Sequence, residues 1–386
     1  MEAAIEPTDR LETTGGMRAA LSGLMDIDDY SWNERGELTM RGRLEAPAQA
    51  IYRAIRARVE ALGYTPFLRR AGDRDELFAM PGVIAHTPPR IGLPVLLFVL
   101  TILTVLFTGA FSASNALAAN PALLLRQPGL LLDGLPFAAT LIGILFAHEM
   151  GHYIVGRLRH APVSLPYFIP IPPIPTPIGI ITLTGTMGAV IVQREPMEDR
   201  KTVLEIGIAG PLAGLAVAIP LLLYGLATSP VAVPTPDMLA HGYIQEGNSI
   251  LYALAKYATH GQWLPLNGTD VQVNAVAWGA WIGLLVTMIN MLPVGQLDGG
   301  HVAYALLGRR ADWLAYAILA MCVVLGLTLS GSWLIWGVLI LLIGPRHPAP
   351  LNDVTPLDAR HKSLAIFGLI IFVLLFMPEP FRNIAP

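Results

Sequence analysis

Two histidines and a glutamate stand together in the pentapeptide His-Glu-Met-Gly-His at residues 148–152. The two imidazoles are four residues apart, so on a helix they lie one turn apart on one face, which is the spacing that grips a zinc ion. Glu149 between them is then positioned to act as a general base on activated water. The motif lies inside an apolar stretch, residues 134–156, where ionisable side chains are costly and usually functional. The sequence therefore predicts a metal site within a membrane.

A third ligand is needed, because a catalytic tetrahedral zinc takes three protein ligands and keeps the fourth position for water. Asp298 is the strongest candidate, since the later apolar segments contain few other ionisable residues. Pro293 and Gly295 interrupt the expected helix before it, so the chain can turn and direct the carboxylate back at the histidines. The glycines at 299 and 300 permit a close backbone approach and a sharp restart of the helix. Taken alone, Asp298 is more typical of a loop residue that caps a helix; its coexistence with the histidine pair reverses that preference in favour of a ligand.

The composition is that of a membrane protein. Of the 386 residues, 54% are hydrophobic and only 14% are charged, against about 25% charged in soluble globular chains, and the mean hydropathy is +0.56. We therefore predict a polytopic α-helical membrane protein embedded in a lipid bilayer. The net charge of −3 argues against a nucleic-acid partner. Cys322 is the single cysteine, so no internal disulfide can form, and cysteine usage does not indicate whether the protein lies in an oxidising or a reducing compartment.

Charge is concentrated at the start of the chain. Residues 1–89 hold 14 of the 28 Asp and Glu and 11 of the 25 Lys and Arg. We predict a small soluble α+β domain over 1–89, followed by a membrane-embedded domain over 90–386 whose core motifs lie in 134–310. Alternating and amphipathic patterns predict strands over 37–44, 65–68 and 76–80, and a helix that Pro47 opens and that runs through Leu62.

About 20 apolar residues are needed to cross a bilayer as a helix. Seven transmembrane helices are expected on this basis, two of them from the uncharged run 313–345, which Gly331 divides; the others lie at 91–111, 137–156, 203–226, 271–292 and 362–377. With the N-terminus inside, 11 basic residues near the spans fall on the cytoplasmic side and only Arg126, Lys256 and Arg382 on the other. Basic residues favour the cytoplasmic side, so a cytoplasmic N-terminus is predicted.

Residues 161–192 contain no charged side chain, yet seven prolines forbid a helix across the first half. The second half, 179–193, is rich in Ile, Thr and Val and is typical of a β-hairpin. Apolar backbone that is not helical is tolerated at membrane depth only against protein or a wet cavity. We predict a re-entrant β-hairpin that lines the active-site cavity and pairs with unwound substrate. An interfacial loop on the bilayer surface fits the sequence equally well.

Other polar and small residues receive less specific interpretations. The sequence Gly-Pro-Leu-Ala-Gly at 210–214 predicts close helix packing through its two glycines, with the alternative that Pro211 loosens the backbone and admits water. Glu205 is expected at the membrane interface, and His301 as an indirect partner of the metal site. The remaining histidines of interest are expected in loops: His160, His241, His260 and His347.

With these motifs the chain resembles the site-2 protease family of intramembrane zinc metalloproteases, peptidase family M50. The resemblance rests on the motif at 148–152, on 210–214 and on an Asn-x-x-Pro-x-x-x-x-Asp-Gly pattern at 290–299, and it covers about 91–345. It implies a zinc held by His148, His152 and Asp298, with Glu149 as base. Asn290 matches the family asparagine that helps to place substrate or stabilise the oxyanion.

The connection between the third and fourth expected spans, 227–270, has only 44 residues, too few for a PDZ-like insertion. Together with the N-terminal domain, this resembles the PDZ-less subgroup that includes the plastid gravitropism-deficient and yellow-green proteins.

The expected function is hydrolysis of a peptide bond in or near the transmembrane segment of a membrane-protein substrate, with one Zn²⁺ per chain. A divalent-metal transporter using the same three ligands is an alternative, although no second copy of either motif is present. A catalytically silent protease-like scaffold is another, which the intact Glu149 argues against. The chain start does not resemble a signal or transit peptide, so the expected location is a prokaryotic plasma membrane. Substrate identity and oligomeric state are left open.

Overall fold

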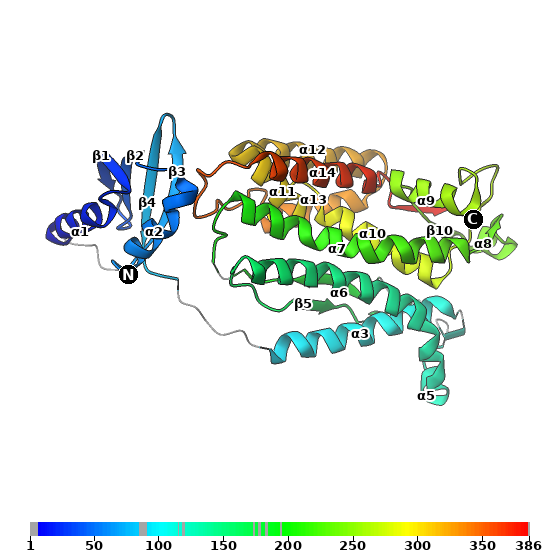
Figure 1. Ribbon diagram of the computed structural model, residues 1–386. Helices are drawn as coiled ribbons and strands as arrows, with labels where there is room; N and C mark the ends of the chain where they lie inside the picture. The colour runs from blue at the N-terminus through cyan, green and yellow to red at the C-terminus, as the bar shows by residue number, and fades with distance from the viewer. Residues whose placement is uncertain are drawn as a thin grey trace. The chain divides into compact units, whose positions relative to one another are not determined.

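The computed structural model describes residues 7–84, 91–114, 116–117, 120–172, 174–176, 179–181, 184–193 and 195–384. The fold is mainly helical with several small sheets (Figure 1). The chain divides into two compact units. The N-terminal unit comprises 1–88, 194–204 and 348–363, and the membrane unit comprises 89–193, 205–347 and 364–386. Residues 194–204 and 348–363, which are distant in sequence from the first 88, thus join the N-terminal unit. The division into domains at 1–89 and 90–386 stays a prediction.

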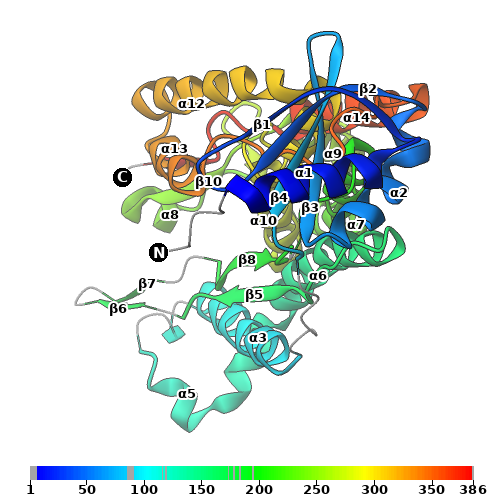
Figure 2. The ribbon, with the colours of Figure 1, turned by 90° about the vertical axis from the view of Figure 1, so that its left-hand side faces the viewer.

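The N-terminal unit contains a four-stranded antiparallel sheet in the order β1-β2-β4-β3, with two helices (Figure 2). Alternate residues of β2, such as Leu38 and Met40, are buried with Tyr52 and Ile55 of the amphipathic helix α2. The element bounds are α1 Pro7–Leu21, β1 Met25–Trp32, β2 Leu38–Leu44, α2 Ala48–Glu60, β3 Tyr64–Ala71 and β4 Arg74–Pro81.

The strands and the helix expected from periodicity in this region correspond to β2, β3, β4 and α2. The sequence reasoning missed α1 and β1. Helix α1 contains Gly15 and Gly16 at its middle, which lowers helix propensity. Strand β1 carries three aspartates, a residue depleted in strands, and is held instead by its pairing with β2.

The β3 edge of this sheet is extended by the two segments that are distant in sequence. Leu68 donates its N–H to the carbonyl of Leu351 at 2.7 Å and accepts a hydrogen bond from the N–H of Asp353 at 2.9 Å. The N–H of Leu351 in turn donates to the carbonyl of Met197 at 2.9 Å. Backbone hydrogen bonds of the kind that join strands therefore include both segments in the N-terminal unit.

The membrane unit is built from apolar helices. Within the part of the chain that the structure describes, four stretches are long and apolar enough to span a membrane: Gly92–Ala113, Pro128–Leu158, Arg200–Ala227 and Asp298–Thr328. Helices are present at all seven stretches where spans were expected, and the count of seven spans itself stays a prediction. The helices are α3 Gly92–Ala113, α6 Leu135–Leu158, α7 Arg200–Ala227, α10 Ala275–Asn290, α11 Asp298–Leu307, α12 Ala311–Thr328, α13 Ser332–Ile343 and α14 Ala359–Leu375, with α5 Leu123–Arg126 and the 3₁₀ turns η1 Pro128–Gly134 and η2 Gly308–Arg310.

Glycines let the central helices α6 and α10 approach closely. A Cβ atom added at Gly283 of α10 would lie 2.8 Å from the Cδ1 atom of Ile144 on α6, and one at Gly279 would lie 3.1 Å from the carbonyl oxygen of Phe137. In lipid the hydrophobic effect does not drive helices together, so helix association depends on close van der Waals packing at small residues such as these. These contacts fix α6, which carries the histidine motif.

A β-hairpin is present after α6, but its pairing differs from the expectation. Strand β8 (Thr186–Val190) pairs with β5 (Tyr167–Pro170), and β6 (Ile174–Thr176) pairs with β7 (Gly179–Ile181). Figure 2 shows the second pair beyond the first. The expected hairpin confined to 179–193 is therefore wrong, because β8 recruits its partner from the proline-rich half. Proline has no N–H to donate, and it is tolerated in a two-stranded ribbon because one edge of each strand makes no hydrogen bonds to another strand.

The connection between α7 and α10, residues 228–274, forms a small cap of short elements. Strand β9 pairs with β11, and β10 pairs with the C-terminal strand β12. The bounds are β9 Val231–Ala232, α8 Pro236–His241, β10 Tyr243–Glu246, α9 Ile250–His260, β11 Asp270–Val271 and β12 Phe381–Ile384.

Candidate metal centre

Tight turns between α10 and α11 return Asp298 toward α6. Helix α10 ends at Asn290, and α11 begins at Asp298 itself. Gly295 has a φ of +56° and donates its N–H to the carbonyl of Pro345. A Cβ atom at Gly299 would lie 1.9 Å from the carbonyl oxygen of Met291. The break and the sharp helix restart expected from the sequence are therefore present, and glycine is required at both positions.

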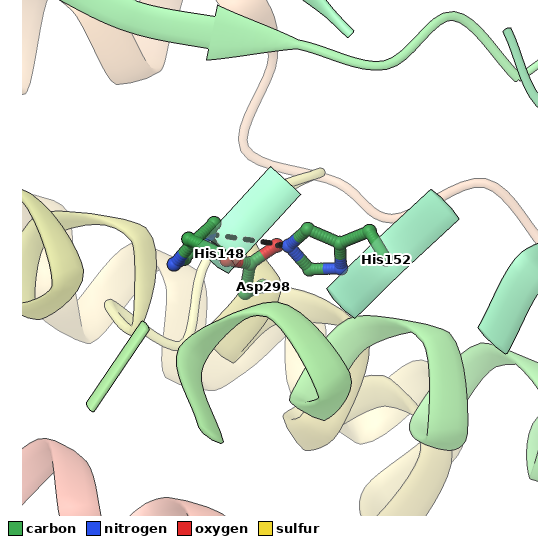
Figure 3. A group of neighbouring side chains, drawn as sticks. All are labelled: His148, His152 and Asp298. Carbon is green, nitrogen blue, oxygen red and sulfur yellow. Dashed lines mark hydrogen bonds and ion pairs between the residues drawn. The ribbon is translucent and has the colours of Figure 1, made fainter. Parts of the chain in front are cut away.

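The donor atoms of His148, His152 and Asp298 converge on one point (Figure 3). The Nε2 atom of His148 is 3.1 Å from Asp298 Oδ2, the Nε2 atom of His152 is 3.3 Å from Oδ1, and the two Nε2 atoms are 3.2 Å apart. Ligands bonded at about 2.0 Å to a tetrahedral zinc lie about 3.3 Å from one another. The three side chains are nearly buried, and the set fits one zinc ion in donor type and in spacing.

A backbone carbonyl orients one of the two imidazoles. The Nδ1 atom of His152 lies 2.7 Å from the carbonyl oxygen of Ile206 on α7, to which Nδ1–H donates a hydrogen bond. This tautomer leaves Nε2 unprotonated and free to bind a metal. Sequence reasoning missed Ile206, because a carbonyl is present on every residue and its side chain carries no signal.

The glycines at 210–214 contact the histidines directly. A Cβ atom at Gly210 would lie 2.0 Å from His152 Nε2, and one at Gly214 would lie 3.2 Å from His148 Cβ. On the facing helix, a Cβ atom at Gly151 would lie 2.5 Å from the carbonyl oxygen of Ala209. Close helix packing, the favoured interpretation of this motif, therefore occurs at the site itself. The alternative role for Pro211, admitting water, stays a prediction.

Glu149 and Asn290 lie beside the three converging side chains. The Glu149 side chain is buried, and its electrostatic neighbours are the imidazoles of His148 and His152 and the carboxylate of Asp298. The Nδ2 atom of Asn290, at the last residue of α10, is 3.4 Å from His148 Nε2. All five predicted site residues are thus gathered by α6, α10 and α11.

The other titratable residues singled out from the sequence occupy different positions. Glu205 forms an ion pair with Arg159. His301 shares a hydrogen bond with His347, their Nδ1 and Nε2 atoms being 2.6 Å apart, and the ring of Tyr304 stacks on His347. Among the described residues, the group able to hold a metal consists of His148, His152 and Asp298 without His301. His347 lies in a loop, as expected, and its contact with His301 connects that loop to α11.

Comparison with known proteins identifies the family of this chain. The model of peptidase family M50 matches residues 136–329, just over half of the chain. The chain therefore belongs to peptidase family M50. The matched region contains α6, α7, α10 and α11, and so all five predicted site residues.

Among curated proteins, the chain is similar to probable zinc metalloproteases named as chloroplastic. It is 36% identical to EGY1 of Arabidopsis thaliana over 254 residues, covering 63% of this chain and 43% of the relative. Identity to EGY2 of the same plant is 31% over 259 residues, covering 65% and 43%. Identity to EGY1 of Oryza sativa is 31% over 272 residues, covering 69% and 44%. The chain thus spans less than half the length of these relatives. No solved structure matches it.

Proposed function

We propose that this protein is an intramembrane zinc metalloprotease that hydrolyses a peptide bond in or near the transmembrane segment of a membrane-protein substrate. The observation that carries the proposal is the convergence of His148, His152 and Asp298 at the separations of zinc ligands, with Glu149 on the same helix. Membership of peptidase family M50 and the names of the curated relatives support the same chemistry.

Each site residue has a distinct role in this proposal. When bound, zinc supplies Lewis-acid chemistry, polarising the scissile carbonyl and acidifying water. Glu149 accepts the proton of the attacking water and delivers it to the leaving amine. Asn290, which lies 3.4 Å from His148 Nε2, holds the substrate carbonyl through its side-chain amide. The carbonyl of Ile206 keeps His152 in the ligating tautomer through its 2.7 Å hydrogen bond.

The β5–β8 hairpin is the proposed substrate-binding element. A helical substrate must unwind before its peptide bond is accessible, and an extended strand is recognised by adding to a sheet edge. Strand β8 contacts α6, the helix that carries the motif, while Met187 and Val190 on β8 are more than half exposed. Among the described residues the sheet of β5 and β8 has two strands, and we infer that substrate pairs with the outer edge of β8.

The decisive experiment compares the wild-type protein with Glu149→Gln after purification in detergent and reconstitution. We expect both to retain one zinc per chain by elemental analysis, and only the wild type to cleave a transmembrane substrate, with cleavage lost on chelation. Cleavage by Glu149→Gln at the wild-type rate would refute the assignment of the base.

Two other outcomes identify the alternative functions. Zinc-dependent metal uptake by proteoliposomes without cleavage would indicate a transporter, and zinc binding with neither activity would indicate a silent scaffold. Proteins that co-purify with Glu149→Gln but not with the wild type would identify substrates.

The membrane location follows from the family and the apolar helices, whereas the kind of membrane is part of the proposal. A prokaryotic plasma membrane with a cytoplasmic N-terminus stays the sequence-based prediction, and the curated relatives reported above are named as chloroplastic. Reporter fusions at the N-terminus and within 228–274 test the orientation. Reporters on the same side of the membrane would refute it.

A further inference from the structure

Helix α9, in the connection between α7 and α10, has its polarity reversed relative to a water-facing helix. Ile250, Leu254 and Tyr257 recur at helical spacing and form its outer face, with 50%, 49% and 45% of their surface exposed. The opposite face is buried and includes Lys256, whose exposure is zero. A surface helix in water normally buries the apolar stripe and exposes the lysine.

The buried side of α9 is a satisfied polar cluster. The Nζ atom of Lys256 lies 2.9 Å from Asp270 Oδ1 and 3.4 Å from Glu246 Oε1, and it sits over the ring of Tyr252. The hydroxyl of Tyr252 donates to Glu246 at 2.9 Å. Burial raises the pKa of the Glu246 carboxyl, and Lys256 opposes that shift. Burying an ammonium group is costly unless it is paired in this way. Lys256 is therefore expected to turn inward, toward the two carboxylates, when the outer face of α9 meets a medium less polar than water.

The start of α9 lies level with the body of an apolar helix. The carbonyl of Gly247, three residues before α9, accepts a hydrogen bond from the indole N–H of Trp281 at 3.0 Å. Trp281 is six residues after the start of α10 at Ala275, about 9 Å along the helix axis. Interfacial amphipathic helices bury their apolar faces about 5–10 Å into the boundary between headgroups and acyl chains. The segment that leads into α9 therefore lies beside the apolar body of α10, not beyond its end.

The end of α7 that leads into the cap is far along the helix from the metal centre. Helix α7 runs 21 residues from Ile206, the hydrogen-bond partner of His152, to its end at Ala227, about 31 Å of helix. The hydrocarbon core of a bilayer is about 30 Å thick. Tyr224 near this end of α7 is 61% exposed, as expected of an aromatic residue at a membrane interface.

An exposed aromatic pair continues the outer face of α9. The rings of Tyr257 and Trp263 stack with centroids 4.7 Å apart, and Trp263 is 56% exposed. Tryptophan and tyrosine are enriched at the level of lipid headgroups, because their rings are apolar while their N–H and O–H groups remain hydrated.

We propose that α9 is an interfacial membrane anchor: Ile250, Leu254, Tyr257 and Trp263 lie in the bilayer interface remote from the metal centre, while Lys256 holds the helix to the protein. The occupant of this apolar face is the lipid of the bilayer that α7, the helix leading into this connection, is long and apolar enough to span. The anchor fixes the far ends of α7 and α10 relative to the bilayer, and these two helices carry Gly210, Gly214 and Asn290 of the site.

Spin labelling in lipid nanodiscs tests the proposal on the full chain. In a Cys322→Ala background, which removes the single buried cysteine, one label is placed at Leu254→Cys. Leu327→Cys, at a 75% exposed position on α12, is the lipid reference, and Glu34→Cys, in an exposed turn of the N-terminal unit, is the water reference. The measurement is the relaxation of each label by oxygen, which partitions into lipid, and by a water-soluble nickel complex.

We expect the ratio of oxygen to nickel accessibility at Leu254 to be several-fold above that at Glu34 and close to that at Leu327. A ratio equal to that at Glu34 would mean that α9 faces water, and would overturn the proposal. Low accessibility to both reagents would overturn it as well, because a second copy or another protein would then cover the face. Circular dichroism of each labelled protein establishes that it is folded. Since no readout depends on catalysis, the result is independent of the proposed protease activity.

Discussion

The N-terminal unit and the membrane unit solve the problem of packing in different ways. In the N-terminal unit, side chains pack on side chains, as Tyr52 and Ile55 do against the sheet, and surface charges such as Arg53 and Glu198 pair in the presence of water. In the membrane unit, helix backbones approach each other closely at glycines. The imidazole of His152 occupies the space that a Cβ atom at residue 210 would need. Packing between side chains tolerates gradual change, whereas position 210 beside the metal ligand has no room for a single methyl group.

The largest effect is therefore expected from Gly210→Ala. The new methyl group would lie 2.0 Å from His152 Nε2, so the ligand must move. Loss of a residue that only orients a metal ligand costs 10–100-fold in metal affinity, and displacement of the ligand itself should cost more than about 100-fold. Zinc content and cleavage are both measured. The matched control is Gly143→Ala on α6, where nothing lies within 4 Å of the added atom. Equal zinc binding by the two variants would contradict the packing described.

Replacing one lysine in each unit sharpens the comparison. Lys256→Met leaves Glu246 and Asp270 buried without their cation, and breaking a buried pair in this way costs about 3–5 kcal/mol of unfolding free energy. Lys201→Met removes a pair with Asp358, whose side chain is 48% exposed, and should cost far less than Lys256→Met, because solvent screens exposed pairs. Denaturation of the purified protein in mixed micelles measures both. A smaller loss for Lys256→Met than for Lys201→Met would contradict the account of the cap.

Tyr52→Phe tests a single buried hydrogen bond in the N-terminal unit. The Tyr52 hydroxyl donates to the carbonyl of Pro66 at 2.8 Å, and its loss should cost about 1 kcal/mol. Burial raises the pKa of the Tyr52 phenol above its usual value, so above about pH 10 the unfolded chain releases this proton before the folded chain does. Stability should then fall as the pH rises, and less so in the variant. Native-state hydrogen exchange measures the difference, and identical pH profiles would contradict it.

The smallest effect is expected from Arg53→Ala. The Arg53 side chain is 82% exposed, and its pair with Glu198 spans 3.2 Å in the presence of solvent. Such pairs contribute about 0–1 kcal/mol and are screened by salt. Hydrogen exchange at low and at high ionic strength should differ little from the wild type at both. A loss as large as that of Tyr52→Phe would show that surface pairs matter more in this unit than we infer.

Much of the site could be predicted because ionisable groups are scarce in apolar sequence. Placing an ionisable side chain in the membrane is costly, so such residues are usually functional. This reasoning identified His148, Glu149, His152 and Asp298. The same approach could not identify the carbonyl of Ile206 or the space that Gly210 leaves for an imidazole. Neither depends on the chemistry of a side chain.

The fold shows a similar division. Alternation and helical periodicity predicted β2, β4 and α2, because each pattern reflects one buried face. The pairing of β8 with β5 was not foreseen, since strands choose partners through contacts that are distant in sequence. The reversed polarity of α9 was missed as well, because Lys256 is buried only through Glu246 and Asp270, which lie on separate strands.

The sequence by itself determined the class of protein, the apolar helices and the types of residue that could bind zinc, because these depend on composition and on spacing within one element. The tertiary structure alone decided the tautomer of His152, the strand partner of β8 and the direction in which α9 turns its apolar face. Those depend on which backbone atoms and charges approach from elsewhere in the chain, and the energies of such approaches are not encoded in any local pattern.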